Sequence, residues 1–570
     1  MTPTVGPRSG VGHDVAMPLA VVGACWLPVA AGGVVWVAGP AASWTTGRGW
    51  HGPAFDLDSG RRLLHDGPAA LWPGTPPVLV WTFAAMLLGA VLVALLGSVT
   101  WWWRVHEARG GDGMATASDV AMLLPRSVAD RTTRLRPSLK ADSRRRPRPA
   151  PENGVLLGRL RGRGRRGPEV RASWEDVVLA VMAPRAGKTT SLAVPAVLDA
   201  PGPVVATSNK PDLWQATCAR RASMAGAGAW VFDPQGITGV ARTWWWNPLR
   251  GVDGVEQAHR LAGHFVEEVR GSKNHRDFWT SAAHDLLTGL LLAAASSERN
   301  LVEVYEWLND PSNTEPARLL ARSGHGAAAA SFLGRQNGAP ETRDGIYETA
   351  RTAAQCLRDP RIMSWVAPDP ATPEFVAHEF VATRHTLYLL SKDGAGAAAP
   401  LVASLADRVM GVAILAAQQA GGRLDPPMVV VLDEAANVCR IADLPELYSH
   451  LGSRGVLPVT ILQSYRQGTR VWGEHGMDAL WSASTCKVLG AGLDDARFVE
   501  DVSRLIGDHD VAVRSISRGS GRASESTSLR RQRIMPAEAI RSLPRGQALL
   551  LATGARVALL ELQPWFRRSS

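Results

Sequence analysis

Two stretches near the start of the chain are apolar over the length of a membrane span. The first covers residues 17–38 and the second residues 78–100, which contain no charged side chain. A helix needs about 20 apolar residues to cross a bilayer, and three tryptophans at 101–103 suit the membrane–water interface. A signal peptide is the alternative for the first stretch, but only Arg8 precedes it as a base and no cleavage pattern is clear. The pattern predicts a transmembrane helical hairpin within residues 1–103.

Basic residues are concentrated after the second apolar stretch. Residues 101–172 contain 17 Arg plus Lys and 7 Asp plus Glu, an excess equal to the formal net charge of +10 of the whole chain. In the loop between the two spans, residues 39–77, three Arg are balanced by three Asp. Because cytoplasmic flanks of membrane helices are enriched in Lys and Arg, we expect a multi-pass protein of the cell membrane with both termini in the cytoplasm.

The basic segment, residues 104–172, is predicted to be a linker. Residues 144–151 mix Arg with Pro, and the Arg residues between 159 and 166 stand among glycines, so neither run favours a regular helix or strand. Two interpretations stay open. The arginines contact phosphates of DNA or of membrane lipid, or their charge only fixes the membrane topology.

Beyond residue 173, short apolar runs alternate with helical patterns, which predicts an α/β fold with a parallel, doubly wound sheet. The alternation is interrupted at residues 254–382, where the periodicity is mostly helical. We therefore expect residues 173–253 and 383–570 to form the two parts of one α/β domain, with an all-α domain inserted between them. The Ser- and Arg-rich residues 514–533 are predicted to be a mobile loop. Strands are expected near residues 177–182, 203–209, 229–234, 386–390, 428–433, 457–462, 485–491, 548–553 and 556–562.

A candidate phosphate-binding loop follows the first of these strands. Gly187-Lys188-Thr189 stands between an apolar strand and a helical pattern, as in loops that cradle nucleotide phosphates with backbone N–H groups. The standard pattern has glycine where this chain has Met182, so a chance match is the alternative. Lysine is rare, however, with only six in the chain, and its compact ammonium group suits a phosphate contact. We therefore expect ATP to bind at the residues Pro184, Arg185, Ala186, Gly187, Lys188, Thr189 and Thr190.

Acidic and amide residues end two later strands. Asp433 and Glu434 close a β-branched run, and Gln463 closes the next apolar strand. An Asp at this position can hold Mg²⁺ together with Thr189, and a Glu beside it can activate the attacking water. Gln463 can contact the γ-phosphate or that water. Together with the Lys188 loop, these residues predict a P-loop ATPase with ATP and Mg²⁺ as cofactors.

The quoted motifs resemble the TraG/TraD family of coupling-protein ATPases of conjugation and type IV secretion. The resemblance covers about residues 154–565 and includes residues 183–190, 208–212 and 432–435. In that family an Ala-Pro version of the loop is usual, so Met182 is no obstacle. The resemblance implies an N-terminal transmembrane pair and a RecA-like motor with an inserted all-α domain. It also implies a homo-hexamer that moves DNA, with or without a bound relaxase, to secretion channel components.

Arg454 lies between the Asp433-Glu434 strand and the Gln463 strand, where the family carries an arginine similar to an arginine finger. Gly452 and Gly455 are expected to free the backbone so that Arg454 can be aimed across a subunit interface. The alternative is a surface arginine at a helix C-terminus, which the helix dipole favours.

Two other functions stay open at this stage. An FtsK-like double-stranded DNA pump is also hexameric and membrane-tethered, but it does not need the long segment between Lys188 and Asp433. A non-catalytic membrane adaptor that binds nucleotide or substrate proteins would not need Lys188, Thr189, Asp433 and Glu434 together. Whether the DNA is single- or double-stranded does not follow from these motifs.

Overall fold

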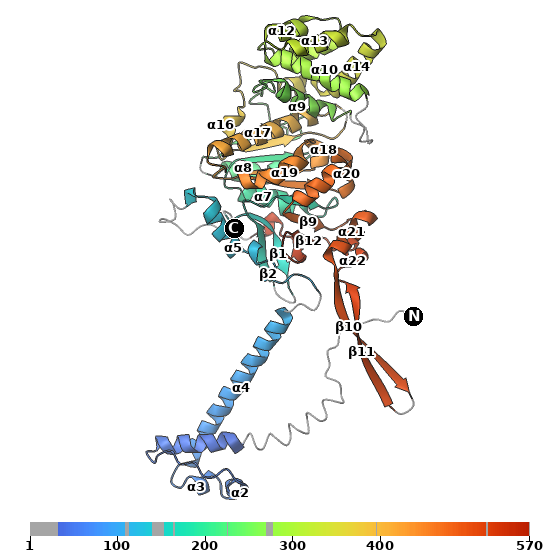
Figure 1. The fold of residues 1–570 in the computed structure, drawn as a ribbon. Helices are drawn as coiled ribbons and strands as arrows, with labels where there is room; N and C mark the ends of the chain where they lie inside the picture. The colour runs from blue at the N-terminus through green and yellow to red at the C-terminus, as the bar shows by residue number, and fades with distance from the viewer. Residues whose placement is uncertain are drawn as a thin grey trace. The chain divides into compact units, whose positions relative to one another are not determined.

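The computed structural model divides into two compact units, Met1–Gly111 and Asp112–Ser570 (Figure 1). It describes residues 32–108, 113–139, 153–162, 166–224, 226–269, 278–394, 396–519 and 522–568.

The first unit is helical in its described part. Residues 32–45 form a helix, which is followed by α2 (Leu57–Asp66), α3 (Pro68–Leu71) and the long α4 (Pro77–Ala108). Trp72 is buried against Gly39, where an added Cβ would lie 2.2 Å from the Trp72 ring. The Trp72 indole N–H donates to the carbonyl of His51 at 3.0 Å, so the connection between the helices is fixed by packing and by a hydrogen bond.

Helix α4 contains the second predicted span. Its Pro77–Ser98 segment has a mean hydropathy of 2.5 and is almost wholly exposed, as a lipid-facing helix would be. Most of the first predicted span lies outside the described residues. In the described part of the chain, one other helix, α17 (Ala399–Gln419), is long and apolar enough to cross a membrane, but it is mostly buried in the core of the second unit.

The second unit is built on an eleven-stranded sheet. The strands from β9 to β5 run parallel, and β2, β1, β13 and β12 are added antiparallel at one side. All strands predicted from residue 177 on are confirmed. The order across the sheet is β2 (Arg166–Ala172), β1 (Val155–Arg161), β13 (Ala558–Glu561), β12 (Gln547–Ala552), β9 (Cys486–Gly490), β3 (Val178–Val181), β8 (Val456–Leu462), β7 (Met428–Asp433), β4 (Val204–Ser208), β6 (Thr386–Leu390) and β5 (Ala229–Phe232).

Both faces of this sheet are covered, which explains the continuous apolar runs of its central strands. Val429 and Val431 of β7 pack in one hydrophobic cluster with α7 (Val194–Asp199). Val430 and Leu432 point to the other cluster, which includes α17 and the helices between β5 and β6. Alternation along a strand thus places successive valines in two different cores.

The linker prediction is wrong for residues 155–172, because β1 and β2 pair in the sheet. The arginines there hide β1, whose first four residues are all buried. Arg171 itself is buried: its guanidinium contacts Asp199 at 3.3 Å and Glu169 at 3.1 Å. Paired in this way, a buried arginine avoids an uncompensated charge. The antiparallel strands also make the sheet mixed, where a wholly parallel one was predicted.

The described residues of the stretch 254–382 are mostly helical, as predicted. The helices are α9 (Val255–Val266), α10 (Phe278–Ala295), α11 (Leu301–Asn309), α12 (Glu315–Arg322), α13 (Gly326–Gln336), α14 (Pro340–Ala353), α15 (Pro360–Met363) and α16 (Ala377–Val381). α10 lies at their centre and is buried over most of its length, because it is apolar on all sides. That these helices form a domain of their own stays a prediction.

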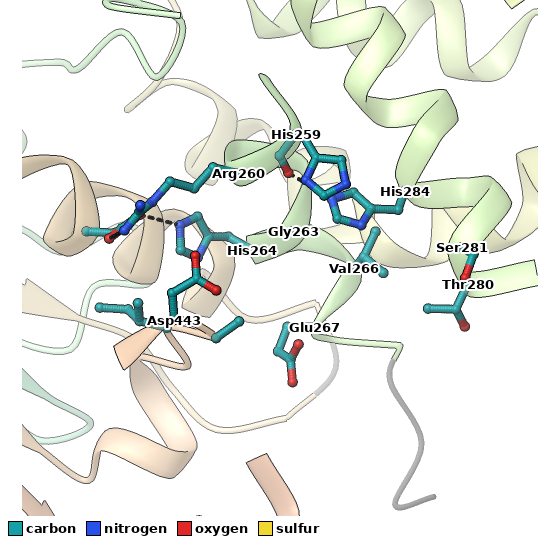
Figure 2. A pocket seen from close by; sticks show the side chains of 13 residues that line it. His259, Arg260, Gly263, His264, Val266, Glu267, Thr280, Ser281, His284 and Asp443 are labelled. Atoms are coloured by element: carbon teal, nitrogen blue, oxygen red, sulfur yellow. Dashed lines mark hydrogen bonds and ion pairs between the residues drawn. The ribbon is translucent and has the colours of Figure 1, made fainter. Parts of the chain in front are cut away.

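A buried carboxylate joins this helical region to α17. Asp407 of α17 receives two hydrogen bonds of 2.6 Å from Arg260 and contacts His264 Nε2 at 3.1 Å. Burial alone would raise the pKa of Asp407, but the hydrogen bonds from His264 and Arg260 lower it to about 2. Figure 2 shows this junction, where the stacked rings of His259 and His284 lie beside Arg260 and His264.

The prediction of a mobile loop at residues 514–533 is wrong as well. β10 (Asp508–Gly519) and β11 (Arg522–Arg533) form an antiparallel ribbon that extends from the body of the unit (Figure 1). Its base is held by Arg533, which bonds to Ser503 at 2.9 Å and Glu500 at 3.1 Å on α21 (Ala496–Ile506). Ser and Arg carry little hydrophobic alternation, so the pairing of the two backbones was not visible in the pattern.

Candidate nucleotide site

The loop between β3 and α7 has the shape of a phosphate cradle. Arg185 and Gly187 both have positive φ, 63° and 93°, so the chain turns sharply before a π-helical turn, Thr189–Ala193, leads into α7. The first N–H groups of a helix have no partner within the helix, and they carry partial positive charge. The loop therefore offers backbone donors to an anion at the carboxyl edge of the sheet.

Met182 takes the place of the first loop glycine without disturbing the loop. Its side chain is buried and packs closely on Gly490 of β9, where an added Cβ would lie 2.4 Å from the Met182 methyl. Its backbone N–H donates to the carbonyl of Leu462 on β8 at 3.0 Å. Met182 thus fills the space below the loop, and a glycine in the facing strand makes room for it.

Asp433 and Thr189 form the part of the site that suits a divalent cation. The Thr189 hydroxyl donates to Asp433 Oδ2 at 2.9 Å, because β7 ends beside the loop. Asp433 Oδ1 is buried and has no hydrogen-bond partner among the described residues. A carboxylate oxygen and a hydroxyl are ligands that Mg²⁺ accepts, with nucleotide phosphates and water as the others. The residues present therefore fit Mg²⁺.

The pKa of Asp433 makes this fit dependent on pH. Burial raises the pKa to about 6, against the lowering effects of Lys188 and of the Thr189 hydrogen bond. Below this pH the carboxyl is protonated, and a proton competes with the cation. We expect the Mg²⁺ affinity of the nucleotide complex to fall by up to about tenfold per pH unit below 6.

Calorimetric titration of Mg²⁺ into the ADP-bound protein at pH values on both sides of 6 measures this effect. Asp433→Asn, which cannot titrate, is the control and should bind weakly at every pH. An affinity of the unsubstituted protein that stays constant down to pH 5 would contradict the assignment of Asp433.

Glu434 is held at the centre of the site. Its carboxylate forms an ion pair with Lys188 and accepts hydrogen bonds from Gln463 and, at 3.0 Å, from Asn437. Its backbone is left-handed, with φ 59° and ψ 40°, a conformation that costs a non-glycine residue about 1–3 kcal/mol. Strain of this kind, held in place by three polar partners, is typical of functional positions.

The structure brings together five of the predicted residues: Lys188, Thr189, Asp433, Glu434 and Gln463. They meet because β3, β8 and β7 are neighbours, with Val181 opposite Leu462 and Asp433 opposite Ile461. Sequence reasoning missed Asn437. Its position three residues after Glu434, in the short helix α18 (Ala435–Val438), is the signal that could have found it.

Comparisons with known proteins find similar chains. A family model described as "TraM recognition site of TraD and TraG" matches residues 427–545. The coupling protein VirD4 of the type IV secretion system of Bartonella quintana is 23% identical over 401 residues, and the conjugal transfer protein TraG of Agrobacterium fabrum is 23% identical over 398 residues. Each alignment covers 67% of this chain, and the chain spans 61% and 59% of the two relatives.

The resemblance to the TraG/TraD-type coupling proteins is confirmed. The bacterial conjugative coupling protein TrwB has a similar fold: the unbound form gives a TM-score of 0.51 at 17% identity, covering 72% of this chain and 89% of TrwB. A second TrwB structure, in complex with ADP and Mg²⁺, gives a TM-score of 0.50 at 18% identity and covers 69% and 87%. The sheet and its helices thus have the fold of the coupling-protein structures.

Arg454, the arginine that the TraG/TraD resemblance selects, lies away from Lys188 and Gln463. It ends a short turn, Gly452–Arg454, before β8, whereas Gln463 follows β8 at the opposite edge of the sheet. Seven strand residues separate the two by roughly 23 Å. Arg454 therefore cannot reach the Lys188 loop of its own subunit.

The expectation about the two glycines around Arg454 is only half correct. Gly455 has φ 74° and needs its conformational freedom. Gly452 has an ordinary helical backbone, and an added Cβ there would lie 2.2 Å from the carbonyl oxygen of Glu175. Close packing, and not flexibility, explains Gly452, so the turn before Arg454 is fixed.

Proposed function

We propose that the chain is a membrane-anchored ATPase that drives DNA, with or without a bound relaxase, to a type IV secretion channel as a conjugative coupling protein. The observation that carries the proposal is the group formed by Lys188, Thr189, Asp433, Glu434 and Gln463 at the carboxyl edge of the sheet. The printed functions of the relatives support the choice of substrate. They are a type IV secretion system-coupling protein and a conjugal transfer protein.

Each residue has a role in hydrolysis that follows from its contacts. Lys188, which pairs with Glu434, can turn to the phosphates and stabilise their charge. Glu434 is then free to accept a proton from the attacking water, and Gln463 and Asn437 hold its carboxylate in place. Asp433 and Thr189 would hold Mg²⁺, which would supply positive charge to the phosphate oxygens. ATP binding thus competes with the ion pair between Lys188 and Glu434.

Proteins of the secretion complex are the second class of partner. The family model that matches residues 427–545 describes a recognition site, and this region runs from β7 through the ribbon of β10 and β11. It contains the hydrolytic residues Asp433 and Glu434. It also contains exposed positions such as Asp494, Arg497 and Asp501. A region of this kind can couple recognition to ATP hydrolysis.

We propose further that the active form is a homo-hexamer in which Arg454 of one subunit serves the site of its neighbour. The position of Arg454, at the edge of the sheet opposite its own loop, supports a role between subunits and not within one. Arginine fingers supplied in this way contribute about 10³–10⁵-fold in turnover. We expect Arg454→Ala alone to assemble but to lose most of its ATP hydrolysis.

Mixing two inactive proteins tests the role of Arg454. Subunits with Lys188→Ala retain Arg454, and subunits with Arg454→Ala retain the loop, so mixed assemblies should regain hydrolysis at the interfaces that combine the two. Arg384→Ala, an exposed arginine at the amino end of β6, is the matched control and should stay active. Normal turnover by Arg454→Ala alone would exclude the finger.

The membrane anchor is proposed to be a hairpin of which α4 is the second span, with residues 39–77 outside the cytoplasm and the motor inside. The exposed apolar surface of α4 and the excess of arginine after it support this orientation. In cells that produce a variant without native cysteines, a membrane-impermeant thiol reagent should label Ser59→Cys. Ser138→Cys should be labelled only after permeabilisation. The reverse result would invert the topology.

DNA-stimulated hydrolysis tests the proposed function. The purified full-length protein should hydrolyse ATP slowly alone and several-fold faster with DNA, and a comparison of single- and double-stranded DNA identifies the substrate. Equal rates with and without either DNA would contradict the proposal.

A further inference from the structure

A pocket of about 350 Å³ opens between α20 (Tyr465–Ala483) and α21, outside the nucleotide site. Its floor is aromatic. The rings of Tyr465 and Phe498 are stacked with their centroids 4.5 Å apart, and Trp481 meets Phe498 edge-on at 5.5 Å. Phe498 is buried, whereas Tyr465 and Trp481 are partly exposed to the pocket. Flat, electron-rich surfaces of this kind attract cations.

The rim of the pocket is acidic. It includes the carboxylates of Glu474, Asp478, Asp495 and Asp501, and two arginines. Arg466 pairs with Asp495 at 2.9 Å. Arg497 lies 4.0 Å from Glu474 and Arg504 lies 3.9 Å from Asp501, but all four side chains are more than half exposed, so both pairs are weak. The rim therefore keeps a negative excess.

The negative field reaches the aromatic floor. The Tyr465 hydroxyl donates to Asp478 Oδ1 at 2.7 Å. Burial, the Asp478 hydrogen bond and the charges of Asp478, Asp501 and Glu474 all raise the pKa of Tyr465. Near the same cluster, Lys487 Nζ lies 5.5 Å from the ring centroid of Trp481, so this aromatic group already stabilises one cation of its own chain.

We propose that this pocket binds an arginine side chain from a basic segment of a partner protein. A guanidinium can stack on the Tyr465 and Trp481 rings while it donates to Asp478 and Asp501. The negative excess of the rim favours a cationic ligand over nucleic acid or anionic lipid. The inference deepens the proposed function, because the pocket lies inside the region matched as a recognition site.

The pocket is also placed to influence hydrolysis. α20 begins two residues after Gln463, with Ser464 as its N-cap. The side chain of Gln467 in its first turn accepts a hydrogen bond from the Gln463 N–H at 3.1 Å. Tyr465 lies between these two glutamines in sequence. A ligand on Tyr465 therefore contacts the same helical turn that positions Gln463 beside Glu434.

Binding of a short fluorescein-labelled arginine–glycine peptide to the detergent-solubilised full-length protein tests the proposal by fluorescence anisotropy at physiological ionic strength. Outside residues 101–172 the basic and acidic side chains balance, so saturable binding of a basic peptide points to a local acidic site. We expect saturable binding. Asp501→Lys, a change at an exposed rim residue, should weaken it about tenfold or more.

Asp494→Lys is the matched control, since Asp494 is exposed and close in sequence but does not line the pocket. It should bind the peptide like the unsubstituted protein, and a glutamate–glycine peptide should not bind. No binding of the arginine peptide, or equal losses in Asp494→Lys and Asp501→Lys, would overturn the proposal. If the protein bound the arginine peptide but did not hydrolyse ATP, the proposal for the pocket would stand and the proposed function would be refuted.

Discussion

Lys188→Ala is expected to lower ATP turnover by at least about a hundredfold, because it removes the ammonium that stabilises charge on the transferring phosphate. The same change leaves the buried Glu434 carboxylate without its ion-pair partner, although Gln463 and Asn437 still donate to it. Steady-state hydrolysis by the purified protein measures the loss. The substitution is far from α4 in sequence, so membrane insertion should be unchanged.

Lys392→Ala is a suitable control for this experiment. Lys392 is another of the six lysines and is exposed after β6, where its backbone N–H donates to the side chain of Gln235. Its replacement should leave hydrolysis without DNA near the unsubstituted rate. A Lys188→Ala protein that turns over ATP normally would show that the loop is not the catalytic phosphate site.

Glu434→Gln is expected to separate ATP binding from hydrolysis. An amide cannot accept the proton of the attacking water, so turnover should fall by about 10²–10⁴-fold, the usual contribution of a general base. The amide is also uncharged, which releases Lys188 from its ion pair. ATP should therefore bind as tightly as before or more tightly.

Equilibrium binding of a fluorescent ATP analogue, measured beside the hydrolysis rate, distinguishes these effects. Asn437→Ala removes one of the hydrogen bonds to Glu434 but keeps its charge, and it should cause a smaller loss of turnover. If Glu434→Gln hydrolysed ATP at the unsubstituted rate, the base would have to be another residue. If it lost ATP binding as well, Glu434 would be needed to form the site.

The centre of the sheet and most of the site could be predicted from the sequence. Strands buried on both faces, such as Met428–Asp433, appear as continuous β-branched runs. Their polar ends, Asp433 and Gln463, mark the edge where parallel strands bind ligands. The positions of Lys188, Asp433 and Gln463 at the carboxyl ends of their strands were therefore enough to predict that they meet.

Three other features could not be predicted, each for its own physical reason. In β1 and β2, the arginines between 159 and 166 suggested a linker, but the two strands pair in the sheet. Inside it, Glu169 and Asp199 compensate the charge of Arg171. The ribbon of β10 and β11 depends on backbone pairing, which its Ser and Arg residues do not reveal. Gly452 is required because its backbone packs against the carbonyl of Glu175. Glu175 lies 277 positions earlier in the chain, so no local sequence pattern contains both residues.

The central claim is that ATP hydrolysis in this chain moves DNA, and displacement of streptavidin from end-biotinylated DNA tests it most directly. With ATP and Mg²⁺, the full-length protein should displace streptavidin from single- or double-stranded DNA, whereas Lys188→Ala and Glu434→Gln proteins should not. Active ATP hydrolysis without displacement from either DNA would contradict the account.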